Sequence, residues 1–424
     1  MRYLLLFTLL QLAQVGYSQT DNYIVSPKKG DPVITVGGAG AFIQGFTNQA
    51  IQLAVDALPP EGGTVQMGAG TYRIMAPVRL RSNVTLIGQG DQTILKRIDG
   101  YRSAFTIDAD YGELKVTVAD ASGFDVGMSI QITDEPNSDC WDVSTAVITD
   151  IVDNTLYFDT HLIRDYVHSK NGMVTNAGSC VAVMNVHDVN MANFVVDGNK
   201  DKNDLLDGCN GGGIAILRSK NVTVENVQVK DFNGEGITWQ ITENVTIRKC
   251  EISGCTNMGL HPGTGSPNSV IEGNKSHDNR VGLFICWRVH HSVVKDNQFY
   301  HNREHGISTG HKDTDVLFEK NHIYNNGSDG VILRNEDEKN SPHRNTFKDN
   351  IVENNGQVQG GYGFYINGKP TEVALINNVI RDTGKGTQKA AVYVTTDTPE
   401  IKNENNTMSG HPKGDVVYEK KAKR

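Results

Sequence analysis

A glycine recurs at a nearly constant interval through the second half of the chain. Gly213, Gly236, Gly259, Gly282, Gly306 and Gly330 are separated by 23 or 24 residues. Each opens a short alternating run, such as Gly-Ile-Ala-Ile or Gly-Val-Ile-Leu. A fixed period of this length without helical spacing is typical of a stacked β-solenoid, because each coil needs its neighbours to complete its core. The repeat therefore predicts an all-β chain of successive coils.

Asparagines form a second repeat just ahead of the glycines. The pairs are Asn274 and Asn279, Asn297 and Asn302, Asn321 and Asn326, and Asn350 and Asn355. Asparagine tolerates the left-handed backbone of tight turns, and stacked amides hydrogen-bond from coil to coil, so these are predicted to be turn residues. Cys250 and Cys255 take the same two positions one coil earlier, which favours core thiols in a turn. A disulfide and, less so, a metal pair stay open as alternatives.

The chain begins with the pattern of a secretory signal peptide. Arg2 precedes an apolar run, and Gly16-Tyr17-Ser18 offers small residues before a cleavage point at residue 18. No later stretch is long and apolar enough to predict a membrane span. We therefore expect an exported protein, periplasmic or secreted.

Charge is distributed unevenly along the sequence. The net charge is −9, which argues against nucleic acid as a partner. Residues 280–312 are nevertheless rich in cations and histidines: Arg280, Arg288, Lys295, Arg303, Lys312, His290, His291, His301, His305 and His311. This zone suits a small anionic ligand, and the protein is expected to act as a monomer.

The N-terminal part carries a second set of motifs. An amphipathic helix over 46–58 precedes Gly62-Gly63-Thr-Val, Gly68-Ala-Gly-Thr-Tyr72 and Asn83-Val-Thr-Leu-Ile-Gly88. These motifs resemble the N-terminal cap of the pectate-lyase-like superfamily. The resemblance implies a right-handed parallel β-helix with a capping helix.

Five segments follow from these patterns. We expect a signal peptide at 1–18, the cap and first coils at 19–100, and the main β-helix at 179–418. Between the coils, residues 101–178 alternate with period two and predict a small antiparallel β-rich insertion. The lysine-rich end, 419–424, is expected to be a frayed tail.

The glycine register predicts which side chains share a face. The residue after each glycine is apolar and should point inward, so the second and fourth residues should point outward. Together with the strand ends, these positions predict one surface groove. Its predicted catalytic residues are His261, His305, His311, Arg334 and Tyr365. Its predicted substrate-binding residues are Gln240, Trp287, Arg288, Lys312, Asn335, Glu336 and Lys369.

A further resemblance covers residues 258–335. Met258-Gly-Leu-His-Pro, Ser276-His-Asp-Asn, His301-Asn-Arg-Glu-His-Gly and Tyr324-Asn-Asn-Gly-Ser-Asp-Gly resemble, in order, the YGFDPH, AHDN, DRHG and YGNGSSG motifs of mannuronan C5-epimerases. The family's tyrosine falls on Met258, its aspartate on His261 and its second histidine on Gly263, whereas His305 matches. The resemblance implies a related uronate reaction with rearranged acid–base residues.

Removing the C5 proton of a uronate requires a base, a cation at the carboxylate and an acid for the leaving oxygen. Histidine, arginine and tyrosine can supply these roles, so we expect β-elimination on a uronate-containing, possibly sulfated, poly- or oligosaccharide. The enzyme would be a lyase, or a dehydratase if a free 4-hydroxyl leaves. A C5-epimerase, a glycoside hydrolase and a non-catalytic carbohydrate-binding β-helix are the alternatives. No metal-ligand set is visible, and the cofactor is left unknown, with calcium open.

Overall fold

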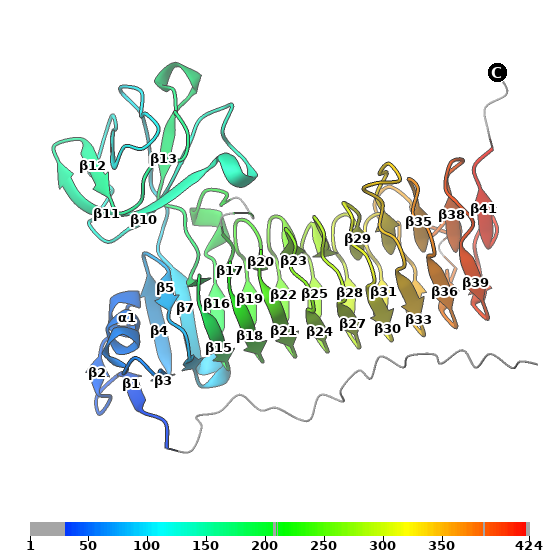
Figure 1. Cartoon of the computed structure of the whole chain (residues 1–424), viewed down its shortest axis with the longest axis horizontal. Coiled ribbons are helices and arrows are strands. Elements are labelled where there is room, and N and C mark those ends of the chain that lie inside the picture. The colour runs from blue at the N-terminus through cyan, green and yellow to red at the C-terminus, as the bar shows by residue number, and fades with distance from the viewer. Residues whose placement is uncertain (1–29, 207–208, 210, 385, 421–424) are drawn as a thin grey trace, which may run out of the picture.

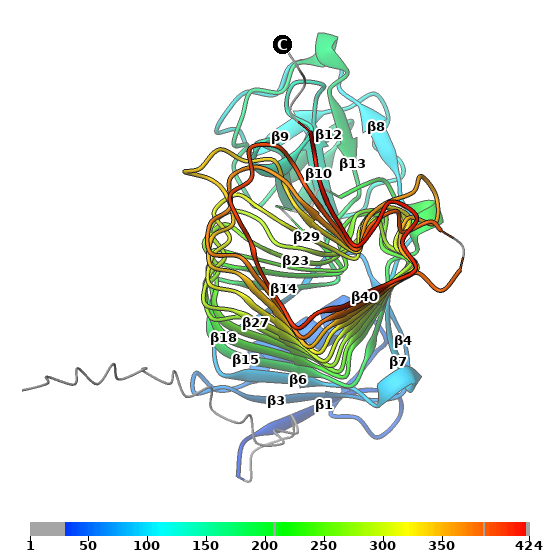
Figure 2. The ribbon, with the colours of Figure 1, turned by 90° about the vertical axis from the view of Figure 1, so that its right-hand side faces the viewer.

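The computed structural model describes residues 30–206, 209, 211–384 and 386–420 (Figure 1). The expected signal peptide and the last four residues of the tail lie outside them. The described chain is a parallel β-helix in which each coil contributes one strand to each of three long sheets, which we call lower, middle and upper after their places in Figure 1. Figure 2 shows the coils stacked in register along the helix axis.

The lower sheet contains, in spatial order, β2 (Ile43–Gln44), β1 (Val33–Gly37), β3 (Gly63–Met67), β6 (Val84–Ile87), β15 (His187–Ala192), β18 (Lys220–Glu225), β21 (Glu243–Arg248), β24 (Val270–Glu272), β27 (Val293–Lys295), β30 (Leu317–Glu319), β33 (Thr346–Lys348), β36 (Ala374–Ile376) and β39 (Lys402–Glu404).

The middle sheet contains β4 (Gly70–Ile74), β7 (Thr93–Arg97), β16 (Val195–Asp197), β19 (Gln228–Lys230), β22 (Glu251–Ser253), β25 (Lys275–His277), β28 (Gln298–Tyr300), β31 (His322–Tyr324), β34 (Ile351–Glu353), β37 (Val379–Arg381) and β40 (Thr407–Ser409).

The upper sheet carries the predicted site. It contains β5 (Val78–Leu80), β14 (Val181–Met184), β17 (Ile214–Leu217), β20 (Ile237–Gln240), β23 (Met258–Gly263), β26 (Val281–Phe284), β29 (Ile307–Thr309), β32 (Val331–Leu333), β35 (Phe364–Ile366), β38 (Val392–Val394) and β41 (Val416–Tyr418).

The predicted register of the upper sheet is confirmed. The residues that follow the repeating glycines are fully buried: Ile214, Ile237, Leu260, Leu283, Ile307 and Val331. The glycines recur because a side chain has no room between coils. A Cβ at Gly259 would lie 2.1 Å from the Oγ of Ser276, and one at Gly282 would lie 2.7 Å from the carbonyl oxygen of Gly306.

The asparagines form the expected ladder inside the turns. The side-chain amide of Asn297 donates to the carbonyl of Ile271 and to Oδ1 of Asn321, both at 2.9 Å. Cys250 and Cys255 are free, buried thiols at the start of this ladder, and the backbone N–H of Cys250 donates to Asn274. The core-thiol interpretation is confirmed, and the disulfide interpretation of this pair is wrong.

The N-terminal end is closed by α1 (Asn48–Ala57), within the predicted helical segment. Thr47 caps the helix by accepting a hydrogen bond from the N–H of Ala50. Ile51 and Val55 are fully buried against the first strands. Among the described residues, no helix is long and apolar enough to cross a bilayer.

The segment between β7 and β14 forms a separate antiparallel sheet, which we call the insertion. Its strands are β8 (Arg102–Ala104), β13 (Met173–Thr175), β10 (Ser129–Thr133), β11 (Ser144–Val152), β12 (Thr155–Phe158) and β9 (Lys115–Thr117). It has its own apolar core, which includes Phe105, Ile130 and Phe158. In Figure 1 it stands over the N-terminal coils, on the side of the upper sheet. At the other end of the chain, Glu419 is held by Thr396, so the tail is ordered at least to that residue.

Candidate functional site

A cavity of about 380 Å³ lies on the upper sheet, where the insertion meets the coils. Four predicted site residues line it: Gln240, His261, Trp287 and Arg288. The other lining residues are Cys140, Trp141, Cys209, Glu235, Asn257, Met258, Thr264, Arg280, Phe284 and Cys286. We call this space the site cavity. It joins residues of several coils to a loop that belongs to the insertion.

His261 is paired with a carboxylate at the floor of the site cavity. Its Nδ1 lies 3.0 Å from Oε2 of Glu235, and both side chains are more than nine-tenths buried. The imidazole also packs edge-on against Phe284, with ring centroids 5.3 Å apart. The two atoms lie at ion-pair distance but not in hydrogen-bond geometry, so the carboxylate acts on the imidazole through its charge and Nε2 is the nitrogen left for a ligand.

Cations and aromatic rings surround this pair. Arg280 and Arg288 both line the site cavity. Trp287 is 53% exposed and stacks on His311 with centroids 5.2 Å apart. Trp141 lines the cavity from the insertion, and its neighbour Cys140 forms a disulfide with Cys209. Guanidinium groups bind carboxylates and aromatic rings accept apolar faces, so this lining suits an anionic ring.

Arg334 lies in the floor of the groove rather than at its mouth. Its guanidinium lies 4.4 Å above the Phe284 ring and donates to Ser308 and to the carbonyl of Ile285. It is also paired at 3.5 Å with Asp313, which is fully buried. Burial lowers the pKa of Arg334. A Cβ at Gly310 would lie 2.8 Å from Nε of Arg334, so the glycine is required for this placement.

The buried Asp313 leads to a prediction about pH. Burial raises the pKa of this carboxyl to about 7, opposed by Arg334 and by backbone N–H donors. The folded protein therefore binds a proton that the unfolded chain releases near pH 4, and this contribution to stability disappears as pH rises towards 7. Between about pH 4 and 7 this group makes the unfolding free energy fall as pH rises. We expect Asp313→Asn to make this fall shallower, by up to about 1.4 kcal/mol per pH unit. Denaturant titrations at several pH values measure it, and equal slopes in both proteins would contradict it.

A second histidine–carboxylate pair lies further along the upper sheet. Nδ1 of His305 lies 3.3 Å from Oδ2 of Asp329, and it accepts a hydrogen bond from the Asp329 backbone. Tyr365 lies one coil beyond Asp329 and two coils beyond His305. The rings of Tyr362 and Tyr393 lie near it, at centroid distances of 5.5 and 5.7 Å. Burial raises the pKa of Tyr365.

The remaining predicted residues gather at the strand ends. His311 is paired with Glu336 at 2.7 Å, and burial together with Arg334 lowers its pKa despite Glu336. The backbone N–H of Lys369 donates to the carbonyl of Glu336. Asn335 and Lys369 are exposed, and Lys312 is half-buried. None of these five side chains lines the site cavity.

The predicted catalytic residues thus share one face but do not meet at one point. His261 is on β23 and Tyr365 is on β35, four strand spacings away, which corresponds to about 19 Å. A single sugar ring cannot contact both. His261 and Tyr365 therefore cannot act as base and acid on one reacting carbon, whereas His261 and Arg334 pack on the same ring, that of Phe284.

Ten of the fourteen described residues that line the site cavity were missing from the sequence-based site, and Glu235 and Trp141 illustrate why. Glu235 had a detectable signal, because it directly precedes a repeating glycine and faces outward. Trp141 had none, since the insertion lies outside the repeat and its position over the coils depends on tertiary packing.

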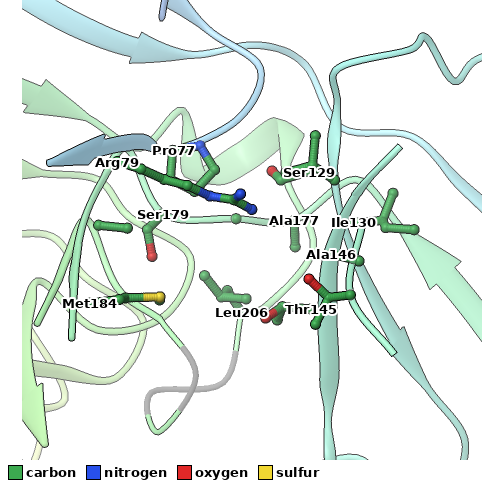
Figure 3. Close-up of a pocket in the computed structure, with 14 residues that line it drawn as sticks. Pro77, Arg79, Ser129, Ile130, Thr145, Ala146, Ala177, Ser179, Met184 and Leu206 are labelled. Atoms are coloured by element: carbon green, nitrogen blue, oxygen red, sulfur yellow. The ribbon is translucent and has the colours of Figure 1, made fainter. Parts of the chain in front are cut away.

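A second cavity, of about 340 Å³, lies between the first coils and the insertion (Figure 3). Arg79 and Met184 reach it from the coils, and Ile130 and Ala146 reach it from the insertion. Among the described residues that line it there is no histidine or carboxylate. Across the described residues, no cluster of three or more histidine, cysteine or acidic side chains could hold a metal ion.

Comparison with known proteins places this geometry in context. No curated protein sequence matches the chain. Among solved structures, the Azotobacter vinelandii mannuronan C-5 epimerase AlgE4 A-module is similar at a TM-score of 0.54 and 16% identity, over 88% of this chain and 96% of that one. The AlgE6 A-module of the same organism gives 0.49 and 16%, with the same coverages. These likenesses concern the fold.

Family models match most of the described chain. A right-handed β-helix model matches residues 201–341 and 292–408, which confirms the expected handedness. A second model matches residues 36–261, more than half of the chain, and covers the cap, the insertion and the coils up to His261. The names of this family and of the structural neighbours are those of carbohydrate-modifying enzymes and do not distinguish a lyase from an epimerase. The chain belongs to the rhamnogalacturonase A/epimerase, pectate-lyase-like family.

Proposed function

We propose that the protein acts on a uronate-containing carbohydrate by removing the C5 proton and eliminating the group at C4. The observation that carries this proposal is the His261–Glu235 pair inside a cavity lined by arginines and aromatic rings. A glycosidic oxygen as leaving group makes the enzyme a lyase, and a free 4-hydroxyl makes it a dehydratase.

His261 is the base of the proposed reaction. Among the described residues it is the one imidazole that lines the site cavity, and the Glu235 carboxylate lies 3.0 Å from its Nδ1. Nε2 takes the C5 proton, and the C5–H electron pair forms the C4=C5 double bond as the C4–O4 bond breaks. The imidazolium can then return the proton to O4 if both groups lie on the same face of the ring. One residue can therefore serve as base and acid, without Tyr365.

Arg280 and Arg288 are the proposed partners of the substrate carboxylate. Proton removal at C5 spreads negative charge onto this carboxylate, so a cation there lowers the barrier. Arg334 is less suited to direct contact, because Asp313, Ser308 and Ile285 already engage its guanidinium. Its positive charge still lies under Phe284, next to the proposed position of the sugar.

Hydrolysis is less compatible with the acids of the groove. Glycosidases need two carboxyl groups within about 5–9.5 Å. Glu235 and Asp329 precede β20 and β32, which are four strand spacings, or about 19 Å, apart. Each also lies within 3.3 Å of a histidine ring nitrogen.

Epimerisation is a second candidate, and His305 favours it. It precedes β29, two strand spacings or about 10 Å from β23, which leaves room for one sugar ring between His261 and His305. A base on one face and an acid on the other would return the proton with inversion at C5.

Product analysis separates these reactions and is our first test. We expect incubation with alginate, polygalacturonate and sulfated uronate oligosaccharides to give an ultraviolet-absorbing product, because the new C4=C5 bond is conjugated to the carboxylate. New reducing ends without this absorbance would point to hydrolysis. Inverted C5 at constant chain length, seen by NMR, would point to epimerisation. Export through residues 1–18 and a monomeric state stay predictions.

A further inference from the structure

We infer that the site cavity receives the end of a carbohydrate chain and not its middle. This inference rests on the proposed function, because it assumes that the ligand is a saccharide bound beside His261. The inference addresses a separate property, the direction in which the groove is open. The evidence is the burial, coil by coil, of the outward-facing residues at the second position after each repeating glycine, which we call the outward row.

The exposure of the residues in the outward row changes at His261. On the N-terminal side its members are Ala182, Ala215 and Thr238, which are aligned on neighbouring strands and only 2–3% exposed. Outward side chains on a sheet are buried when another segment or a longer neighbouring side chain covers them, and Ile130 and Ala146 of the insertion line the same cavity as Ala182. The site residue His261, next in the row, is 6% exposed.

On the C-terminal side the row is open. Phe284, Ile332, Tyr365 and Tyr393 are all partly exposed. Ser308 is buried in this stretch, but by the guanidinium of Arg334 that belongs to the same floor. From β26 to β41 the open stretch spans five strand spacings, or about 24 Å, enough for several sugar units. In Figure 1 the insertion does not reach over β29 and the strands beyond it.

The closed end has an identifiable wall. Cys140 and Trp141 of the insertion line the site cavity together with Cys209, and the Cys140–Cys209 disulfide ties the insertion to the segment that precedes β17. The cavity on the other side, beside Ala182 and Leu206, has no lining residue in common with the site cavity in the part of the chain that the structure describes. A saccharide bound at His261 can therefore extend towards β41, but the wall blocks its extension in the opposite direction.

The wall predicts chain-end action. The terminal sugars would occupy the site cavity, with Trp141 at the closed end and Trp287 at the open side, while the rest of the chain lies over Phe284 and Ile332. An enzyme with this geometry releases products of one size from the first turnover, and the average length of the polymer falls slowly.

Binding stoichiometry tests the inference without turnover. Calorimetry with the His261→Ala protein and size-fractionated alginate or polygalacturonate should give one bound protein per chain end, unchanged from short to long fractions. Stoichiometry that grows with chain length would overturn chain-end binding and leave the proposed reaction intact. Failure to bind either polymer, together with no ultraviolet-absorbing product from the native enzyme, would overturn both.

A variant of the wall gives a matched test. The Cys140→Ser, Trp141→Gly, Cys209→Ser protein should gain internal binding sites, so its stoichiometry should increase with chain length. Because the insertion has its own core, we expect its unfolding transition to persist, and far-ultraviolet circular dichroism checks this. A folded triple variant that still binds only at chain ends would overturn the assignment of the wall.

Discussion

Replacing His261 by alanine is expected to lower the rate of product formation by about 10²–10⁴-fold, the usual contribution of a general base. The reason is that His261 is the one imidazole lining the site cavity, and its Nδ1 is already paired with Glu235. The fold should not change, because the side chain lies outside the coil interior. Initial rates of ultraviolet absorbance, measured at saturating substrate, report the loss as a change in kcat.

Three further variants are needed to interpret this result. Glu235→Gln keeps the shape but removes the negative charge beside Nδ1 of His261, so we expect a smaller loss that changes the pH profile of kcat. His187→Ala breaks an exposed histidine–carboxylate pair on the lower sheet and should have no effect. His305→Ala distinguishes the two candidate reactions, since elimination at His261 tolerates its loss and a two-base epimerisation does not. A fully active His261→Ala enzyme would refute the mechanism.

The local rules of the repeat made most of the fold predictable. The repeating glycines mark positions with no room for a Cβ, and the asparagines are the turn residues whose amides bond from coil to coil. Because strands alternate with period two, the same register also identified His261 and Arg334 as residues of one face. The Met258-to-His261 motif pointed to the same face.

The axial position of each residue also follows from the number of its repeat in the sequence. One repeat corresponds to one strand spacing, so His261 and Tyr365 had to lie four spacings apart. Arg334 is largely buried although its place in the repeat faces outward, and the reason is a different one. Its burial depends on Asp313, which lies outside the outward positions of the repeat, and on the missing side chain of Gly310, which takes the same position as Arg334 one coil earlier.

Contacts between the insertion and the coils could not be derived from periodicity. Trp141 and the Cys140–Cys209 disulfide belong to segments that interrupt the repeat, and a disulfide partner cannot be deduced from sequence alone. They nevertheless decide where the groove ends. The repeat thus specifies the floor of the site, and the non-repetitive insertion specifies its closed end.

The asparagine ladder should be the most sensitive part of the fold, and Asn321→Ala is expected to lower the free energy of unfolding by about 3–5 kcal/mol. Oδ1 of Asn321 accepts from both the backbone and the side-chain amide of Asn297, and its own amide donates to the carbonyl of Val294. Alanine leaves these groups buried without partners, at about 1–3 kcal/mol for each.

Gln228→Ala is the matched control for the ladder. This amide is exposed on β19, so its removal should change the unfolding free energy by less than about 0.5 kcal/mol. Denaturant titrations of both variants under identical conditions give the comparison. Because coils contact only their neighbours, the loss at Asn321 acts first on the coils that contain β28, β31 and β34, and hydrogen exchange should increase there before it increases near α1. A loss below about 1 kcal/mol at Asn321 would mean that water or a shifted turn satisfies the groups of Asn297 and Val294 that lose their partner. The ladder would then be a consequence of the coil geometry and not one of its causes.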